Sequence, residues 1–266
     1  MGAVGLTIII LGSSALAGER AGLEEAEGLL TGPEFDLPQA LRALEIYENL
    51  LPQATAERTN VLTRLAQVCF ILGEVREKAQ KERYFNQGRG YAEVLCQEQP
   101  DWADGHYWLA LNLCGLVDAR GAKEGFRLLP TIIRELERTL SIDAAYDQAG
   151  AHRVLGRIYY EAPPWPLSVG DLHKSLGHLT AAVRIAPENS TNHLYLAETL
   201  FRLGKKDAAR QELERVLKST HHAIRPQGLK DDHQEAQRLL KEWAISGGRI
   251  LRHTPLARAD YGAEKS

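Results

Sequence analysis

The histidines and carboxylates near the C-terminal end of the chain have residue types and a spacing that would suit metal chemistry. His221 and His222 precede the run Asp231-Asp232-His233. Imidazole nitrogens and carboxylate oxygens are zinc ligands when a loop brings them together. The alternative is a solvated connection before a helix whose first turn is capped by Asp231 or Asp232. We favour the capping interpretation and predict neither a metal site nor a cofactor.

Motifs for enzymatic catalysis are missing from the sequence. It contains no Gly-rich phosphate-binding loop, no G-x-S-x-G turn and no H-E-x-x-H pair. Carboxylates such as Glu212 and Glu214 lie two residues apart in a helical segment, so they point to different faces and do not form an acid–base pair. Since catalysis needs such groups held together in a cleft, we predict that the protein is not an enzyme.

The overall composition is that of a globular protein without an affinity for nucleic acid. Among 266 residues, 44% are hydrophobic, which is enough for a sizeable core in one large domain or two small ones. The 32 basic and 35 acidic residues give a net charge of −3. A protein that binds a phosphate backbone usually carries a basic surface, so we exclude nucleic acid as a partner.

The three cysteines lie in apolar helical segments and have no metal-ligand spacing. They are Cys69, Cys96 and Cys114. We expect buried free thiols that behave as small hydrophobic side chains, while a disulfide stays open because pairing cannot be assigned from sequence. His106, like the other histidines in the helical segments, is interpreted as an ordinary polar helix position.

The first 17 residues have the features of an export signal. They carry no charge, and the apolar run Val4–Leu11 is far shorter than the roughly 20 residues that span a membrane. The small-x-small pattern Ala15-Leu-Ala17 predicts cleavage after Ala17 and export to the periplasm. Glu19 stands where lipidation requires a cysteine, so we predict no lipid anchor. The alternative is an apolar N-terminal segment packed on the domain.

The clearest helical repeat begins at Leu155-Gly-Arg-Ile-Tyr159 and ends at Pro187. The tetratricopeptide (TPR) pattern has L-G-x-x-Y in its first helix, a bulky residue in the second and a terminal proline. Gly156 allows the two helices to approach closely, and Leu179 is expected to fill the space between them. Pro187 ends the second helix because proline cannot continue the hydrogen-bond ladder.

Similar first-helix motifs begin at Leu65, Leu109 and Leu196, with spacings longer than the roughly 34 residues of the standard repeat. We therefore predict an all-α, TPR-like helix–turn–helix solenoid with about four extended repeats and flanking capping helices. The predicted ranges are a domain at 18–244 with units near 58–100, 103–143, 149–187 and 190–221, a cap at 229–243 and a flexible tail at 245–266.

The first helices of such an array line its concave face, which is where TPR proteins bind ligands. These positions are rich in Arg, Tyr and Trp, the residue types most common at binding hot spots. The alternative is that Trp108 belongs to the core and that Arg153 and Arg157 pair with neighbouring Glu side chains. The predicted inward-facing residues are Asn60, Arg64, Gln67, Tyr107, Trp108, Arg153, Arg157, Tyr160, Tyr195, Glu198 and Arg202.

Two known families share these motifs. The block Ala151–Tyr160, the Pro-rich turn Ala162–Pro166 that lengthens the repeat, and the later Pro187 resemble the T-component of the tripartite ATP-independent periplasmic (TRAP) transporters. The segment Gly105–Asn112 is similar both to that family and to the helical domain of the regulator-of-microtubule-dynamics proteins.

The TRAP resemblance implies a periplasmic helper that partners a solute-binding protein and binds a small ligand. Members of that family are often lipoproteins and can be trimeric. This chain departs from the lipoprotein pattern at Glu19, where no lipid-accepting cysteine is present. Two further functions stay open: a general exported TPR adaptor that binds a peptide or protein of the envelope or secretion machinery, and an intracellular co-chaperone-like module. The sequence leaves the partner and the oligomeric state undetermined.

Overall fold

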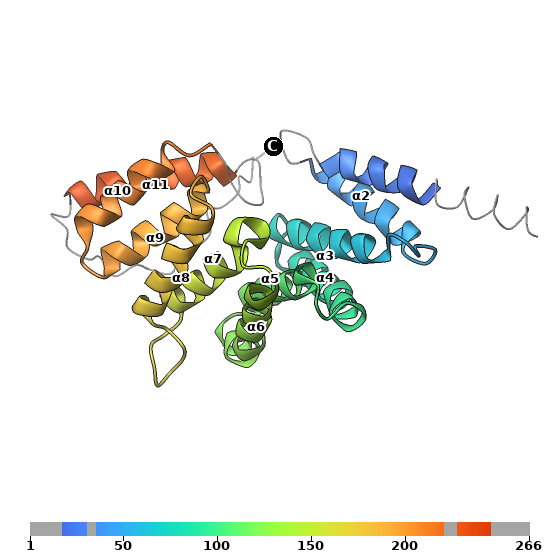
Figure 1. Cartoon of the computed structure of the whole chain (residues 1–266), viewed down its shortest axis with the longest axis horizontal. Coiled ribbons are helices and arrows are strands. Elements are labelled where there is room, and N and C mark those ends of the chain that lie inside the picture. Colours follow the sequence, from blue (N-terminus) through green and yellow to red (C-terminus); the bar gives the residue numbers. More distant parts are fainter. Residues whose placement is uncertain (1–17, 31–35, 221–227, 246–266) are drawn as a thin grey trace, which may run out of the picture. The chain divides into compact units, whose positions relative to one another are not determined.

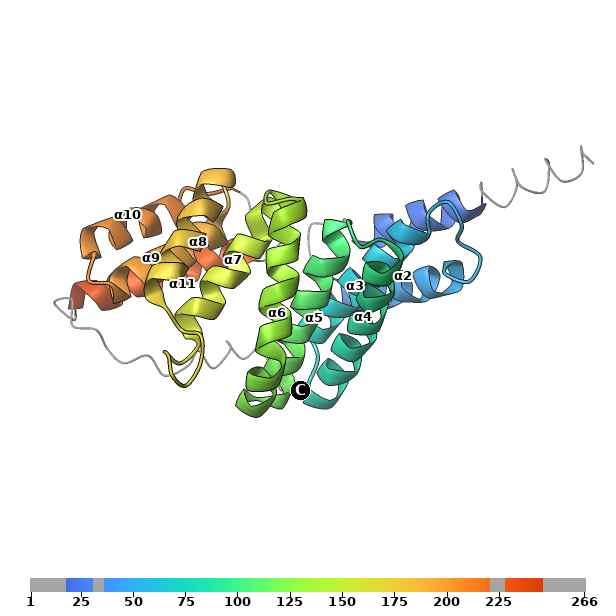
Figure 2. The same ribbon diagram turned by 60° about the horizontal axis from the view of Figure 1, so that its bottom comes forward.

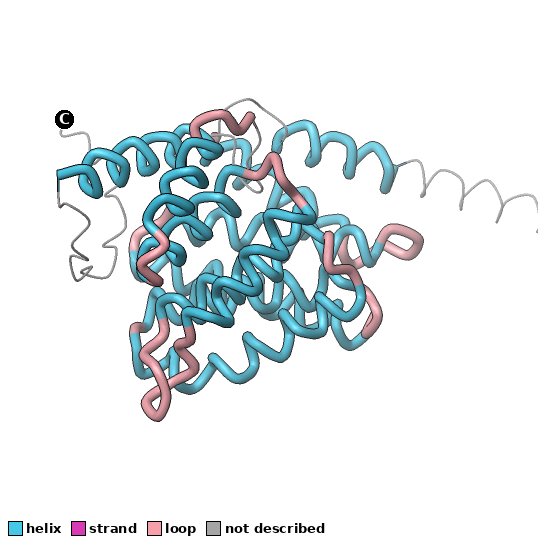
Figure 3. Tube along the Cα trace, turned by 60° about the vertical axis from the view of Figure 1, so that its left-hand side comes forward, coloured by secondary structure: helices cyan, strands magenta, loops and turns pink. Residues whose placement is uncertain are grey.

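The computed structural model describes residues 18–30, 36–220 and 228–245 (Figure 1). The described residues form helices, turns and one isolated bridge, with no strand among them (Figure 3). A helix over residues 18–30 precedes the labelled ones. The labelled helices are α2 (Leu37–Leu50), α3 (Arg58–Glu74), α4 (Lys78–Glu98), α5 (Ala103–Arg120), α6 (Ala122–Ile142), α7 (Tyr146–Glu161), α8 (Leu172–Ile185), α9 (Ser190–Arg202), α10 (Lys206–Val216) and α11 (Gly228–Ile245).

The predicted all-helical fold is confirmed. None of the described helices is long and apolar enough to cross a membrane. The proposed signal sequence (1–17), His221 and His222 lie outside the described residues, as does the proposed tail from residue 246 onward. The chain divides into two compact units, residues 1–135 and residues 136–266.

In the first unit, α3, α4 and α5 pack against one another (Figure 2). The ring of Phe85 on α4 is fully buried and lies over Gly73 of α3 and Gly115 of α5. A Cβ atom at either glycine would come closer than 3.0 Å to that ring. The two glycines therefore make the notches that the ring fills, which allows three helices to pack closely around one side chain.

In the second unit, the pairs α7–α8 and α9–α10 form successive helix hairpins, and α11 packs on α9 and α10. A Cβ atom on Gly156 would lie 2.5 Å from Cγ of Leu179, so these residues mark the close approach of α7 and α8, as predicted. Asp171 caps α8 by accepting hydrogen bonds from the backbone N–H groups of His173 and Lys174. The ring of Trp243 on α11 stacks on Phe201 of α9 at 3.9 Å, which closes the core at this end.

The first turn of α7 holds three consecutive residues in the left-handed region. Asp147, Gln148 and Ala149 have φ values of 48°, 54° and 64°. This conformation costs an L-residue roughly 1–2 kcal/mol, so neighbouring groups must hold it in place. No glycine stands at these positions to relieve the strain.

Candidate partner-binding surface

The second unit brings together five of the residues predicted for the concave face. The guanidinium of Arg157 on α7 lies 5.0 Å from the ring centroid of Tyr160 and 4.6 Å from that of Tyr195 on α9. Arg202 lies 4.5 Å from the Tyr160 ring and donates a 2.8 Å hydrogen bond to the Tyr160 carbonyl. Glu198 accepts a hydrogen bond from Arg157. Cations stacked on aromatic faces therefore join α7 to α9.

The charge of Arg157 is neutralised inside this cluster. Its guanidinium pairs with Glu198 at 2.5 Å and with Glu161 at 2.6 Å. Burial alone lowers the pKa of Arg157, but the two carboxylates outweigh it and the pKa is raised. Burial also raises the pKa of the Tyr160 hydroxyl to about 12. Arg157 is thus engaged within the protein, as the alternative interpretation expected, whereas Arg202 keeps an exposed side chain.

Arg153 has a structural role, although its ion-pair partner is an aspartate and not the glutamate that the alternative expected. Its side chain is buried, with 4% of its surface exposed, and it pairs with Asp147 at 2.6 Å. Its guanidinium also donates to the carbonyls of Asp147 and Gln148 and to Oδ1 of Asn192. These bonds hold the left-handed turn at residues 147–149, which explains how the strained backbone is stabilised.

The aromatic residues predicted for the first unit lie in its core. Tyr107 is fully buried and Trp108 is 4% exposed. Trp108 contacts the rings of Tyr107 at 5.4 Å and Phe70 at 5.9 Å. Their positions on α5 turn toward α3 and α4 instead of toward a ligand, because α5 is buried along nearly its whole length.

Of the three polar residues predicted on α3, Arg64 contacts another helix, whereas the contacts of Gln67 and Asn60 are local. Arg64 bonds Glu27 of the 18–30 helix at 3.1 Å and Gln67 at 2.9 Å. The side chain of Asn60 donates to Glu57 at 3.5 Å. The N-terminal helix therefore occupies the position beside Arg64 where a ligand was expected.

The most exposed apolar residues of the described chain lie on a loop that the sequence interpretation treated only as a longer turn. Trp165 is 84% exposed and Leu167 is 72% exposed. The loop projects from the helices between α7 and α8, in yellow in Figure 1. The signal for it in the sequence was a Trp and a Leu inside a Pro-rich run, since such residues have no place in a simple turn.

Backbone contacts fix the base of this loop to the end of α7. The N–H of Gly170 donates to the Pro163 carbonyl at 2.9 Å, and the N–H of Asp171 donates to the Tyr159 carbonyl at 2.8 Å. A Cβ atom at Gly170 would come closer than 3.0 Å to the backbone of Ala162 and Pro163. Only glycine allows so close an approach, so the loop has a defined closure.

Helix hairpins of this kind define a TPR-type scaffold. A tetratricopeptide repeat model matches residues 167–232. The structure is also similar to TTC0263, a thermophilic TPR protein of Thermus thermophilus, with a TM-score of 0.62 and 19% identity over 84% of this chain and 99% of that chain. The predicted TPR-like solenoid is therefore confirmed.

The family follows from a second match. The model of regulator of microtubule dynamics protein 1-3 matches residues 23–165 of the 266, more than half of the chain. The chain belongs to this family. One of the two resemblances seen in the sequence is thus confirmed, while the resemblance to the TRAP T-component is not. A search of curated proteins gives no match.

Proposed function

We propose that the protein is a non-catalytic scaffold that binds a protein partner through the loop at residues 162–170 and the adjoining end of α7. The observation that carries this proposal is the exposure of Trp165 and Leu167 on a loop with a fixed base. Trp is the residue type most enriched at binding hot spots. A loop that is already closed loses less conformational entropy when a partner binds.

Charged side chains next to the loop suit the polar rim of an interface. Glu161 and Arg202 are exposed, and Arg202 is bonded to the carbonyl of Tyr160, two residues before the loop begins. Of the predicted concave-face set, Arg202 is the member with an exposed side chain. A guanidinium of this kind binds a carboxylate with two parallel hydrogen bonds. The surface therefore favours a partner with an apolar pocket bordered by charged groups, acidic opposite Arg202 and basic opposite Glu161.

The family name ties its members to the regulation of microtubule dynamics, so polymerised microtubules are the first partner to test. Co-sedimentation of the full chain would be compared with that of the double variant Trp165→Ala, Leu167→Ala. We expect the double variant to lose about 2 kcal/mol or more of binding free energy, roughly 30-fold in affinity. Its melting temperature should stay unchanged, because both side chains are solvent-exposed.

Trp102→Ala is the matched control, since Trp102 is an exposed tryptophan (47%) of the first unit. The control should bind as the wild type does. Equal binding by the wild type and the double variant would contradict the role of the loop. If the wild type does not co-sediment, the same three proteins would be used in affinity capture, where a true partner must be lost with the double variant alone.

A second candidate is an exported helper or adaptor, and the observation that favours it is the Val4–Leu11 run before Ala15-x-Ala17. If the protein is a TRAP-transporter helper, its partner is a periplasmic solute-binding protein. If it is a general exported adaptor, its partner is a component of the envelope or secretion machinery. N-terminal sequencing of native protein tests both, because a chain that begins at Met1 or Gly2 has not been cleaved. An uncleaved chain in the cytosolic fraction would favour the co-chaperone-like module.

A further inference from the structure

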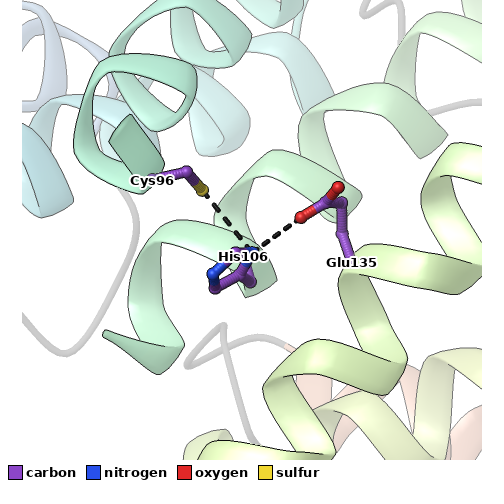
Figure 4. A group of neighbouring side chains, drawn as sticks. All are labelled: Cys96, His106 and Glu135. Atoms are coloured by element: carbon purple, nitrogen blue, oxygen red, sulfur yellow. Dashed lines mark hydrogen bonds and ion pairs between the residues drawn. The ribbon is translucent and has the colours of Figure 1, made fainter. Parts of the chain in front are cut away.

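Three side chains with metal-binding atoms converge in the first unit from three different helices (Figure 4). They are Cys96 of α4, His106 of α5 and Glu135 of α6. Their sulfur, nitrogen and oxygen atoms all lie within 4.8 Å of one another. We propose that these residues bind one zinc-class divalent cation, with a fourth coordination position left for water or an external ligand.

The distances are close to those of a tetrahedral zinc site. Zinc bonds of roughly 2.0–2.3 Å place neighbouring ligand atoms about 3.3–3.8 Å apart. Sγ of Cys96 lies 3.7 Å from Nδ1 of His106. Oε2 of Glu135 lies 2.6 Å from the same nitrogen, so the carboxylate must move back by about 1 Å or less to admit the ion. A flexible glutamate side chain can make this movement without a change in the helices.

Neighbouring groups orient the ligands as the outer shell of a metal site does. Nε2 of His106 lies 3.0 Å from the Pro100 carbonyl, which fixes the proton on that nitrogen and leaves Nδ1 to face the ion. Arg134 bonds the other oxygen of Glu135 at 2.8 Å, which leaves Oε2 directed at the histidine. His106 and Glu135 are also about nine-tenths buried, so water competes weakly for the ion.

The second unit repeats this arrangement without the sulfur atom. Nε2 of His193 on α9 lies 2.7 Å from the Pro187 carbonyl, and its Nδ1 lies 2.6 Å from Glu212 of α10. Each histidine follows its proline by six residues. The residue four positions before the proline is Cys96 in the first unit and Val183 in the second. In the second unit, the His–Glu pair joins two helices of a repeat without a thiol. The first unit has the same pair and adds the thiol of Cys96 to it.

The donor set selects the kind of ion. Magnesium and calcium take oxygen ligands, whereas a thiolate with an imidazole and a carboxylate suits zinc and related ions such as cobalt(II). On binding, the thiol loses its proton to solvent as the metal–sulfur bond forms, and the proton shared by Nδ1 of His106 and Oε2 of Glu135 also leaves to solvent as the metal takes its place between them. Three protein ligands leave one position open, as in catalytic or exchangeable zinc sites and unlike closed structural sites.

The experiment is titration of the metal-free full chain with zinc, followed by calorimetry, and with cobalt(II), followed by absorption. We expect one ion per chain and a sulfur-to-cobalt charge-transfer band. Cys96→Val, which installs the residue that the second unit carries, should remove the band and weaken zinc binding on the order of 100-fold or more. Cys114→Ala is the control with a different cysteine removed, and it should bind as the wild type does.

Glu135→Gln gives a second variant of nearly the same size, so the test does not depend on the folding of Cys96→Val. Circular dichroism would check that each variant is folded. The proposal is wrong if the wild type binds no zinc, or if it binds cobalt without the charge-transfer band. It is equally wrong if zinc binding survives unchanged in either folded variant. The outcome is independent of the proposed function, because the loop at 162–170 belongs to the other unit.

Discussion

Replacement of Arg153 by methionine tests whether this residue stabilises the fold or binds a ligand. The substitution keeps a long apolar side chain but removes the ion pair with Asp147, which has 15% of its side-chain surface exposed. It also removes the hydrogen bonds to the carbonyls of Asp147 and Gln148. Truncating one partner of a buried ion pair costs about 3–5 kcal/mol. In addition, the left-handed turn would lose the groups that hold it.

The expected loss corresponds to a decrease in melting temperature of roughly 10–20 °C for a unit of this size. Thermal and urea unfolding followed by circular dichroism would measure it. Arg153→Lys should also destabilise, because an ammonium cannot reproduce the fork of bonds that the guanidinium makes. Arg210→Met is the control, since Arg210 on α10 is exposed and should change stability by less than about 0.5 kcal/mol. A melting temperature for Arg153→Met within about 2 °C of the wild type would refute this reasoning.

Three other substitutions check the packing and its dependence on pH. Gly156→Ala should cost about 1–3 kcal/mol in urea unfolding, because its Cβ would meet Leu179 at 2.5 Å; no loss would contradict the close approach. Trp108→Ala should cost about 3–5 kcal/mol as a core truncation, and an unchanged stability would place the ring outside the core. Burial, with the nearby His152, lowers the pKa of His178 from 6.5 to about 4. The unfolded chain therefore takes up this proton first, and stability should fall as the pH decreases from 6.5 to 4. His178→Gln should flatten that part of the curve, and an identical slope in both proteins would assign the effect to other groups.

The helix–turn–helix repeats could be predicted from the sequence because their motif depends on residues that are close together in the chain. Gly156, Leu179 and Pro187 occupy positions whose physical reasons hold in any helix hairpin, and the structure confirms the contact between the first two. The site was harder to predict, because exposure depends on what packs against each helix. Arg64, for example, faces Glu27, a residue 37 positions earlier in a helix that the repeat pattern does not describe.

Other features could not be predicted from the sequence and became visible only in the structure. No glycine marks the left-handed turn at residues 147–149, so nothing in the sequence assigned Arg153 to stabilise it. Cys96 and Glu135 lie far from each other in sequence and meet at His106 only through the packing of three helices. The exposure of Trp165 likewise depends on how the base of its loop closes.

The position of Phe85 over Gly73 and Gly115 also has a consequence for how these residues can change in evolution. Since both glycines contact one ring, alanine at either of them disturbs the same side chain, and the costs of the two substitutions should not be additive. A smaller residue at position 85 would remove the reason for both glycines. The three positions are therefore expected to covary among relatives, as a large aromatic with two glycines or a smaller side chain with two alanines.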